Sequence, residues 1–498
     1  MVRLIVAEKP SVARDIARVL GVKERRAGFL ASSRDWVTWC VGHLVELVEP
    51  HEYAARFKSW RFDDLPILPE RFKLRPIGQT EDQFNVLKRL LTSAEVDEVV
   101  NACDAGREGE LIFRQVYTLA ASTKVVRRLW ISALTDEAIG KGLSNLTAGE
   151  AFDALGDAAR SRAEADWLVG INATRALTLL GRRGGGRGDL LSVGRVQTPT
   201  LAMLVRREEE IEAFVPEPFW QVKAIFETEA GERYLGVYFK GKLDRFDERG
   251  KAETVVAAIE GGHGQVAKVT EKKHAEPPPL LFDLTELQKV CNRRFGFSAQ
   301  KTLDIAQSLY ETHKVLTYPR TDSRYLSSDQ KGELPGLIAK LAVGPYTPFA
   351  NAILAKGKLR LGRVINDAEV GDHPAIIPTG LLPGRNRLSA DERSVFDWVI
   401  RRFLAAFMPD AEFARTRVES VVAKHRFLSK GQVCLEAGWQ AVEPPPSKRA
   451  DDDDQSLPLL KKEQPVAVGE VKLHEGKTQP PKRYSEASLL GAMERAGR

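Results

Sequence analysis

The 498-residue sequence is poor in cysteine and has no long apolar run. Its four cysteines are far apart: Cys40, Cys103, Cys291 and Cys434. The absence of a CxxC pair excludes a zinc ribbon of the usual spacing and a disulfide framework, and reduced thiols are typical of the cytoplasm. No apolar run approaches the roughly 20 residues of a membrane helix, and the N-terminal run is too short for a signal peptide. We therefore expect a cytoplasmic protein without a membrane segment.

Two further features are weak or missing. No GxxxxGK[ST] sequence is present, so the chain lacks the phosphate-binding loop of common ATPases. The 74 basic and 68 acidic residues give a net charge of only +6, which permits a nucleic-acid partner without requiring one. Hydrophobic residues (43%) and charged residues (29%) occur in the proportions of a folded protein. The length predicts roughly three to four folding units.

Two segments near the N-terminus have the pattern of a strand followed by a helix. Leu4–Ala7 is a continuous apolar run, typical of a buried strand, and a helix with Ser11 as its N-cap is expected to follow Glu8. A second strand–loop–helix unit places Asp104 directly after its strand. We therefore predict an α/β domain with a parallel sheet over residues 1–150.

The rest of the chain alternates between helical and β-like patterns. In chain order we predict helices at 151–180 and 198–212, β-like runs at 219–275, a helical insert at 280–405 and β-like runs at 411–480. A basic, glycine-rich loop at 182–188 and an acidic run at 451–454 are interpreted as surface loops. The position of the insert suggests that both β-like segments belong to one domain.

Acidic residues follow both predicted strands of the N-terminal domain. Ligands collect beyond the carboxyl ends of parallel strands, where Glu8 and Asp104 lie, and Glu108 follows in a glycine-flanked run. Carboxylates suit Mg²⁺, and Lys9 could neutralise a phosphate beside them. The alternative is that these are ordinary charged residues of strand-end loops.

Tyr318-Pro319-Arg320 is a candidate nucleophilic motif. Pro319 favours an extended backbone at Tyr318, whose oxygen could attack phosphorus while Arg320 stabilises charge on the non-bridging oxygens. Because the ordinary pKa of a phenol is about 10, nearby cations are needed to favour the phenolate. A purely structural tyrosine is the alternative.

Further residues suit a phosphate backbone: Arg162, Asp166, Ser192, Arg195, Gln197 and His373. The loop at 192–197 precedes a helix whose first amides could bind phosphate, although an ordinary helix cap fits as well. His373 could donate to a phosphate oxygen or be a satisfied loop residue. Arg162 and Asp166 are one helical turn apart, a spacing that also fits a surface ion pair.

Together these segments resemble type IA DNA topoisomerases, most closely the bacterial topoisomerase III branch. The matching motifs occur in the family's order over nearly the whole chain: LIVAEKPSVA, DAGREGELI, ADWLVGINATRA, LSVGRVQTPTL, FGFSAQKTLDIAQSLYETHKVLTYPRTDSRYL, HPAIIPT and TQPPKRYSEASLLGAM. The resemblance implies a multidomain α/β plus α+β fold, with an N-terminal Toprim (Rossmann-like) domain in a toroid wide enough for DNA. The implied domains are Toprim (1–150), a helical single-strand-binding domain (151–215, joined by 484–498), a β-rich arch (216–279 and 406–483) and a helical domain with the nucleophile (280–405).

The resemblance also implies an activity. Such enzymes need no ATP, cut one DNA strand through a 5′-phosphotyrosine, pass a strand and religate, which relaxes negative supercoils or decatenates DNA. By position, the implied catalytic residues are Tyr318, Glu8, Lys9 and Arg320, the Mg²⁺ ligands Glu8, Asp104 and Glu108, and the DNA contacts Ser192, Arg195, Gln197, Arg162, Asp166 and His373. The implied partners are single-stranded or negatively supercoiled DNA and a helicase or single-strand-binding protein, and the implied state is a monomer.

Two departures from the family's pattern bear on activity. Many relatives have an acid where Gly106 stands, so we expect a weaker or simpler metal site. The sequence ends at Arg498, directly after the last motif, so we expect a fragment or truncated form that exposes apolar surface over 151–215. The alternatives are a Toprim-type nuclease or primase-like enzyme without a covalent tyrosine, and an inactive truncated DNA-binding form.

Overall fold

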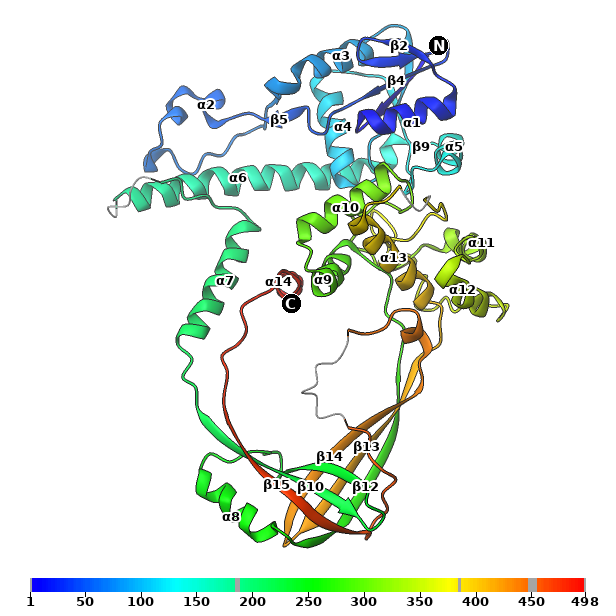
Figure 1. The fold of residues 1–498 in the computed structure, drawn as a ribbon. Helices are drawn as coiled ribbons and strands as arrows, with labels where there is room; N and C mark the ends of the chain where they lie inside the picture. The colour runs from blue at the N-terminus through cyan, green and yellow to red at the C-terminus, as the bar shows by residue number, and fades with distance from the viewer. Residues whose placement is uncertain (1, 184–188, 384–386, 447–454, 497–498) are drawn as a thin grey trace.

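The computed structural model describes residues 2–183, 189–383, 387–446 and 455–496. The acidic run at 451–454 and most of the basic loop, 184–188, lie outside these ranges. The chain forms a ring around an open hole, with the N-terminal domain on one side and a β-barrel on the other (Figure 1). In the described parts of the chain, no helix is both long and apolar enough to cross a membrane.

The N-terminal domain is built on a seven-stranded sheet. Its strands, in sheet order, are β2 (Glu24–Arg26), β3 (Phe29–Ala31), β4 (Asp35–Trp39), β1 (Val2–Ala7), β7 (Val96–Ala102), β8 (Val125–Arg128) and β9 (Thr147–Ala148). Its helices are α1 (Pro10–Leu20), α3 (Glu81–Leu91), α4 (Arg107–Leu119) and α5 (Asp136–Ser144). The four central strands are parallel, as predicted, and the edge strands are antiparallel.

The prediction of Ser11 as a helix cap is wrong. Helix α1 begins at Pro10 and has Lys9 as its N-cap, because proline has the backbone φ that the first helical turn requires. The helix ends at Gly21, whose φ of 71° lies in the left-handed region that glycine adopts easily.

An insert in this domain lies along one long helix. The insert contains β5 (Val45–Leu47), α2 (Pro50–Tyr53) and β6 (Leu74–Pro76). Residues 151–183, read as several helices, are mainly the single helix α6 (Asp153–Arg183), so Arg182 and Arg183 are helical too. Trp167 donates to Val48 and Arg175 to Phe57, and these contacts with the insert support the length of α6.

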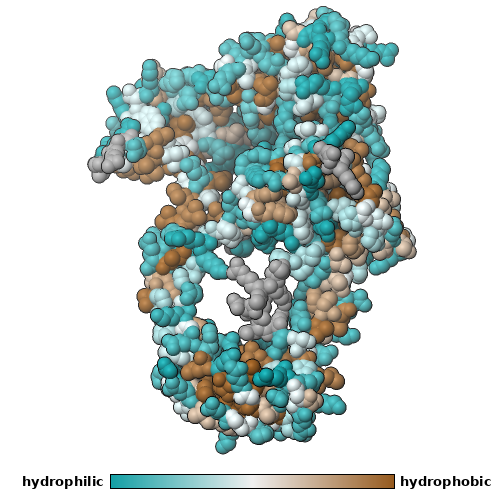
Figure 2. All heavy atoms as spheres, viewed as in Figure 1, coloured by the Kyte–Doolittle hydropathy of each residue, from teal (hydrophilic) through white to brown (hydrophobic). Residues whose placement is uncertain are grey.

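Helix α7 (Gln197–Glu212) confirms the predicted helix and the expected exposed apolar surface. Every side chain of α7 is at least partly exposed. The large exposed apolar side chains of α6 and α7 include Val169, Leu177, Leu180, Leu201 and Val205. Figure 2 shows apolar side chains gathered where α6 and α7 approach each other.

Strands from both β-like segments form one closed barrel. Its strands, in barrel order, are β10 (Pro218–Thr228), β11 (Arg233–Tyr238), β14 (His425–Glu436), β13 (Ala411–Val422), β12 (His263–Glu276) and β15 (Pro465–Lys477). Helix α8 (Arg249–Ile259), which the sequence analysis did not predict, buries Ala252, Val255 and Ile259.

The insert between the barrel strands is helical and has its own apolar core. Its helices are α9 (Leu284–Phe295), α10 (Ala299–Glu311), α11 (Leu334–Lys340), α12 (Thr347–Leu354) and α13 (Ala390–Ala405). Ser298 caps α10, where its side chain accepts a hydrogen bond from the Lys301 amide. The last helix, α14 (Glu486–Arg495), lies against α9 through an ion pair of Lys289 and Glu494, and reaches α7 where Thr200 contacts Met493.

Candidate active site

Two buried carboxylates meet at the carboxyl edge of the N-terminal sheet. Strands β1 and β7 are parallel neighbours, so the residues that follow them lie side by side. Glu8 follows β1 and Asp104 follows β7; each is 8% exposed. The Asp104 amide donates to the Glu8 carboxylate over 3.2 Å. The two strand-end acids predicted from the sequence are therefore together, and both are shielded from water.

Burial changes the proton affinity of both acids. Burial, and then the Asp104 carboxylate, raise the pKa of Glu8 to about 7. Burial also raises the pKa of Asp104. Lys9 Nζ lies 4.0 Å from Glu8 and 3.9 Å from Asp104, and also pairs with Glu311 of α10. Glu8 can therefore hold or release a proton near neutral pH.

Tyr318 reaches this cluster from the helical insert. Its backbone amide donates to the Ser132 carbonyl of the N-terminal domain over 2.9 Å, and its ring packs in that domain's apolar cluster. Burial, and then the Asp104 and Glu8 carboxylates, raise the pKa of Tyr318 far above its ordinary value, although Arg320 opposes them. The positive charge of Arg320 is outweighed by burial and by the two carboxylates. The phenol is therefore protonated in this closed arrangement.

His373 is enclosed between two aromatic rings. Its ring centroid lies 4.2 Å from that of Tyr318 and 5.9 Å from that of Trp130. It is 2% exposed, and neither ring nitrogen has a hydrogen-bond partner among the described residues. Burial lowers the pKa of His373 to about 3, so the ring is neutral. His373 is therefore not a satisfied loop histidine, and its nitrogens are available to a ligand.

The third predicted metal ligand lies apart from the other two. The Glu108 side chain is 69% exposed and pairs with His43 over 2.6 Å, a hydrogen bond that lowers the pKa of Glu108. Across the described residues, no group of three or more His, Cys, Asp or Glu side chains is arranged to hold a metal ion. Mg²⁺ commonly binds one or two carboxylates together with waters and phosphate, so the Glu8–Asp104 pair fits that ion.

Nothing steric excludes an acid at Gly106. Its φ of 166° is extended backbone that any residue adopts. A Cβ atom built there would meet only His373, with Nε2 at 3.5 Å. This edge of the sheet therefore has room for one more carboxylate beside Asp104.

The predicted DNA-binding residues lie along α6 and the loop before α7. Arg195 pairs with Asp166 over 2.5 Å, so Asp166 bonds to this loop rather than to Arg162. Arg162 instead lies near enough to Glu108 to help lower its pKa, after the larger effect of His43. The Ser192 hydroxyl donates to Gln197 over 3.4 Å. All five of these predicted side chains are exposed, so they form a polar surface on α6 and at the start of α7.

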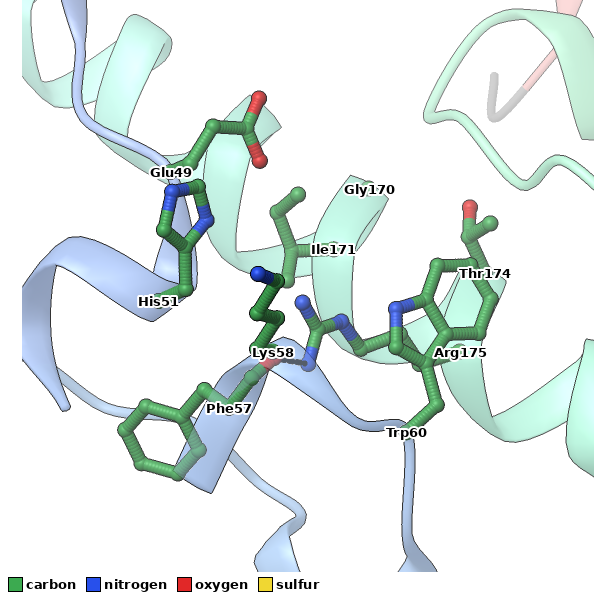
Figure 3. Close-up of a pocket in the computed structure, with 9 residues that line it drawn as sticks. All are labelled: Glu49, His51, Phe57, Lys58, Trp60, Gly170, Ile171, Thr174 and Arg175. Carbon is green, nitrogen blue, oxygen red and sulfur yellow. Dashed lines mark hydrogen bonds between the residues drawn. The ribbon is translucent and has the colours of Figure 1, made fainter. Parts of the chain in front are cut away.

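A cavity of about 280 Å³ lies between α6 and the insert (Figure 3). It is lined by Glu49, His51, Phe57, Lys58, Trp60, Gly170, Ile171, Thr174 and Arg175. The Arg175 guanidinium lies 5.1 Å from the Trp60 ring and donates to the Phe57 carbonyl over 2.8 Å. Proteins commonly bind the nucleotides of single strands with a cationic side chain beside an aromatic ring.

Two family models match the chain: the Toprim domain over residues 3–134, and DNA topoisomerase over residues 150–497. The chain belongs to the type IA DNA topoisomerase family. It is 42% identical to DNA topoisomerase 3 of Bacillus cereus, over 99% of this chain and 67% of that protein. The same figures hold for DNA topoisomerase 3 of Bacillus subtilis (strain 168). The resemblance stated from the motifs is confirmed.

The fold of this topoisomerase is also that of a solved relative. It matches full-length topoisomerase I from Thermotoga maritima with a TM-score of 0.74 at 24% identity, over 99% of this chain and 75% of that one. The predicted fold class, with its N-terminal Toprim domain, is confirmed. The comparisons support a topoisomerase rather than a nuclease, a primase-like enzyme or an inactive DNA-binding form.

The sequence analysis missed several groups that surround the tyrosine. Glu311 pairs with Lys9, Gln307 donates to Glu311, and Arg320 donates to Gln307 over 3.5 Å. Gln307 and Glu311 are one helical turn apart on the helix that leads to Tyr318, and this spacing could have indicated them. No sequence signal indicates Trp130, whose role depends on a residue of another domain.

Proposed function

We propose that this topoisomerase cuts one DNA strand with Tyr318, holds the 5′ phosphate as a phosphotyrosine during strand passage, and religates without ATP. The observation that supports this most is that Tyr318, from residues 280–405, packs in the apolar cluster of residues 1–150, near enough to Glu8 and Asp104 for their charges to act on its phenol. Single-stranded or negatively supercoiled DNA would be the substrate. The enzyme would act as a monomer, with a helicase or single-strand-binding protein as partner.

The chain's own side chains suffice to describe the transfer. The Tyr318 oxygen forms a bond to phosphorus, the bond from phosphorus to the 3′ oxygen breaks, and the phenol proton passes to water. The departing 3′ oxygen takes a proton from Glu8, which regains one on religation. Lys9 and Arg320 stabilise charge on the non-bridging oxygens. The phosphotyrosine keeps the energy of the broken bond, so no ATP is needed.

We also propose Mg²⁺ as the cofactor, with Glu8 and Asp104 as ligands. Bound there, the ion would supply positive charge beside Asp104 and the scissile phosphate, and Glu8 would be its ligand only while deprotonated. Glu108 can join as a third ligand only after its bond to His43 breaks. The observation that favours a cation at this edge is that burial, and then the Asp104 carboxylate, raise the pKa of Glu8.

Strand passage requires an opening in the ring. We propose that the contact between residues 1–150 and 280–405, called the gate below, opens while the barrel formed by 216–279 and 406–483 acts as the hinge. Among the residues that the structure describes, four ion pairs join the two sides of the gate: Lys9–Glu311, Asp15–Lys314, Arg107–Asp372 and Lys141–Glu333.

We propose that the cut strand lies along residues 151–215. Arg162, Asp166 and loop 192–197 would contact its phosphates, with His373 at the cut. The cavity beside Trp60 and Arg175 would hold a nucleotide farther along the same helix. Basic groups beside an aromatic ring suit single strands, because stacking tolerates any base.

A covalent trap tests the nucleophile. Labelled single-stranded DNA is mixed with protein and Mg²⁺, and the reaction is stopped with denaturant. We expect Tyr318→Phe to form no adduct while its single-strand affinity is nearly unchanged. Tyr325→Phe, seven residues on, is the matched control and should form adduct normally. Adduct formation by the Tyr318→Phe protein would contradict the assignment.

A further inference from the structure

Trp130 lies on the Toprim side of the gate and contacts the tyrosine side. It follows β8, where the Leu129 amide donates to the Asn101 carbonyl over 3.0 Å. Its ring stacks on Phe152 with centroids 4.8 Å apart, and the Arg128 guanidinium lies 5.0 Å from it. Arg128 belongs to the Toprim side, and Phe152 ends the short helix Gly149–Phe152 that directly follows it. Trp130 is therefore held firmly on one side of the gate.

The contact of Trp130 across the gate is with His373. The two rings are 5.9 Å apart at an interplanar angle of 15°, a nearly parallel arrangement. On the other side of the imidazole lies Tyr318, which belongs to the same domain as His373. When the gate opens, His373 keeps Tyr318 but loses Trp130. The stack on Trp130 therefore exists only in the closed protein.

The imidazole has few other restraints. Neither ring nitrogen has a hydrogen-bond partner among the described residues, and the ring is neutral, so no ion pair orients it. Nε2 lies 3.5 Å from the position of a Cβ on Gly106, beside Asp104. Without Trp130, the ring would be free to turn about its side-chain bonds, and water would reach it.

We propose that Trp130 is a positioning residue that acts through His373. On closure, Trp130 fixes the plane of the imidazole so that Nε2 faces the DNA phosphate bound beside Gly106. Trp130 itself touches no reacting group. This inference rests on the proposed function and extends it to a residue outside the motifs. Misplacement of one catalytic contact can lower a rate by as much as about 100-fold, which sets the scale of the effect.

The test is a double-mutant cycle on the single-strand cleavage rate at saturating DNA, with DNA affinity measured separately in EDTA. Trp130→Leu keeps apolar volume without a ring, and Trp130→Phe keeps the stack. We expect Trp130→Leu to slow cleavage by roughly 10- to 100-fold, with DNA affinity within about twofold of the parent. Trp130→Phe should restore most of the rate. In a His373→Ala background, Trp130→Leu should add less than about a twofold loss.

Three results would overturn the inference. Losses that multiply in the double variant would show that Trp130 does not act through His373. Failure of Trp130→Phe to restore the rate while its melting temperature matches the parent would show that the stack is irrelevant. If the parent protein itself forms no covalent adduct, the proposed function fails and this inference fails with it; adduct formation with additive losses contradicts this inference alone.

Discussion

Glu8 shows how strongly one buried position changes a side chain's chemistry. Burial, and then the Asp104 carboxylate, raise its pKa from an ordinary value of 4.5 to about 7. A carboxyl group with that pKa is present in both protonation states at neutral pH. A group that gives a proton and later regains it needs this property. Burial, and then the Asp104 and Glu8 carboxylates, raise the pKa of Tyr318 and keep its phenol protonated in the closed protein.

The shifted pKa of Glu8 makes the stability of the metal-free protein depend on pH. Between pH 4.5 and about 7 the folded state holds a proton that the unfolded chain has lost. Stability is therefore lost as the pH rises through this window, by roughly 3 kcal/mol for this group. We expect Glu8→Gln to be more stable than the parent at pH 8 by about that amount, and no more stable at pH 4.5. Urea unfolding in EDTA measures both, and equal pH trends in the two proteins would contradict the shift.

Position 106 offers a gain-of-function prediction. Because the backbone there is extended and a side chain has room, Gly106→Asp should fold normally and place a third carboxylate beside Asp104. We expect about tenfold tighter Mn²⁺ binding by calorimetry, since affinity rises with ligand charge. Gly106→Asn is the matched neutral control. An equal gain with Asn, or none with Asp, would rule out a metal site at this edge.

The site was predictable only in part. Glu8, Asp104 and Tyr318 follow strand-end and motif rules that operate within a few residues. The pair of Lys9 and Glu311 joins side chains 302 positions apart, and no local pattern encodes such a partner. The orientation of the Glu108 side chain, which points away from Glu8 and Asp104, depends in the same way on its hydrogen bond to His43. His43 lies in the loop after another strand, β4.

At the scale of elements, local signals fixed some boundaries and missed others. Ser298 and Gly21 mark helix ends because capping and left-handed backbone are local effects. Helix α8 was missed because its short apolar pattern lies among strands. The length of α6 depends on the insert packed along it, which residues 151–180 do not encode themselves.

Helix α13 is joined to the segment between β14 and β15 by a buried ion pair of Arg402 and Glu443. Arg402 Nε donates to Glu443 over 2.5 Å, Nη1 donates to the Leu280 carbonyl over 3.1 Å, and the pair is almost fully buried. Because Glu443→Ala leaves a buried charge without its partner, we expect a loss of roughly 3–5 kcal/mol in the unfolding free energy. Asp410→Ala, which breaks the exposed pair with Arg360, should cost less than about 1 kcal/mol. Equal urea midpoints for the two variants would contradict this account of the hinge.

At the scale of the whole molecule, the ring is closed by contacts of unequal strength. The side chains of Asp15 and Lys314 are 18% and 19% exposed, whereas those of Lys141 and Glu333 are 69% and 67% exposed. Water and salt screen the exposed pair, so it should contribute little to closure. The order of motifs indicated this ring, but nothing local indicated which ion pairs hold it closed.

The two pairs give a prediction for gate opening. With fluorescent labels on α3 and α12, we expect Asp15→Asn to raise the open fraction several-fold and Glu333→Gln to leave it nearly unchanged. Each substitution removes one charge from one gate pair, so each is the control for the other. Equal effects would mean that the gate is held by something other than the partly buried pair.

The central claim is that the Tyr318 oxygen becomes esterified to the 5′ end of a cut strand. The most direct measurement is mass spectrometry of the trapped adduct after nuclease and trypsin digestion. We predict that the residual nucleotide 5′-phosphate lies on the peptide Val315–Arg320, at Tyr318. A nucleotide on any other peptide, or cut DNA with no covalent peptide, would contradict the account.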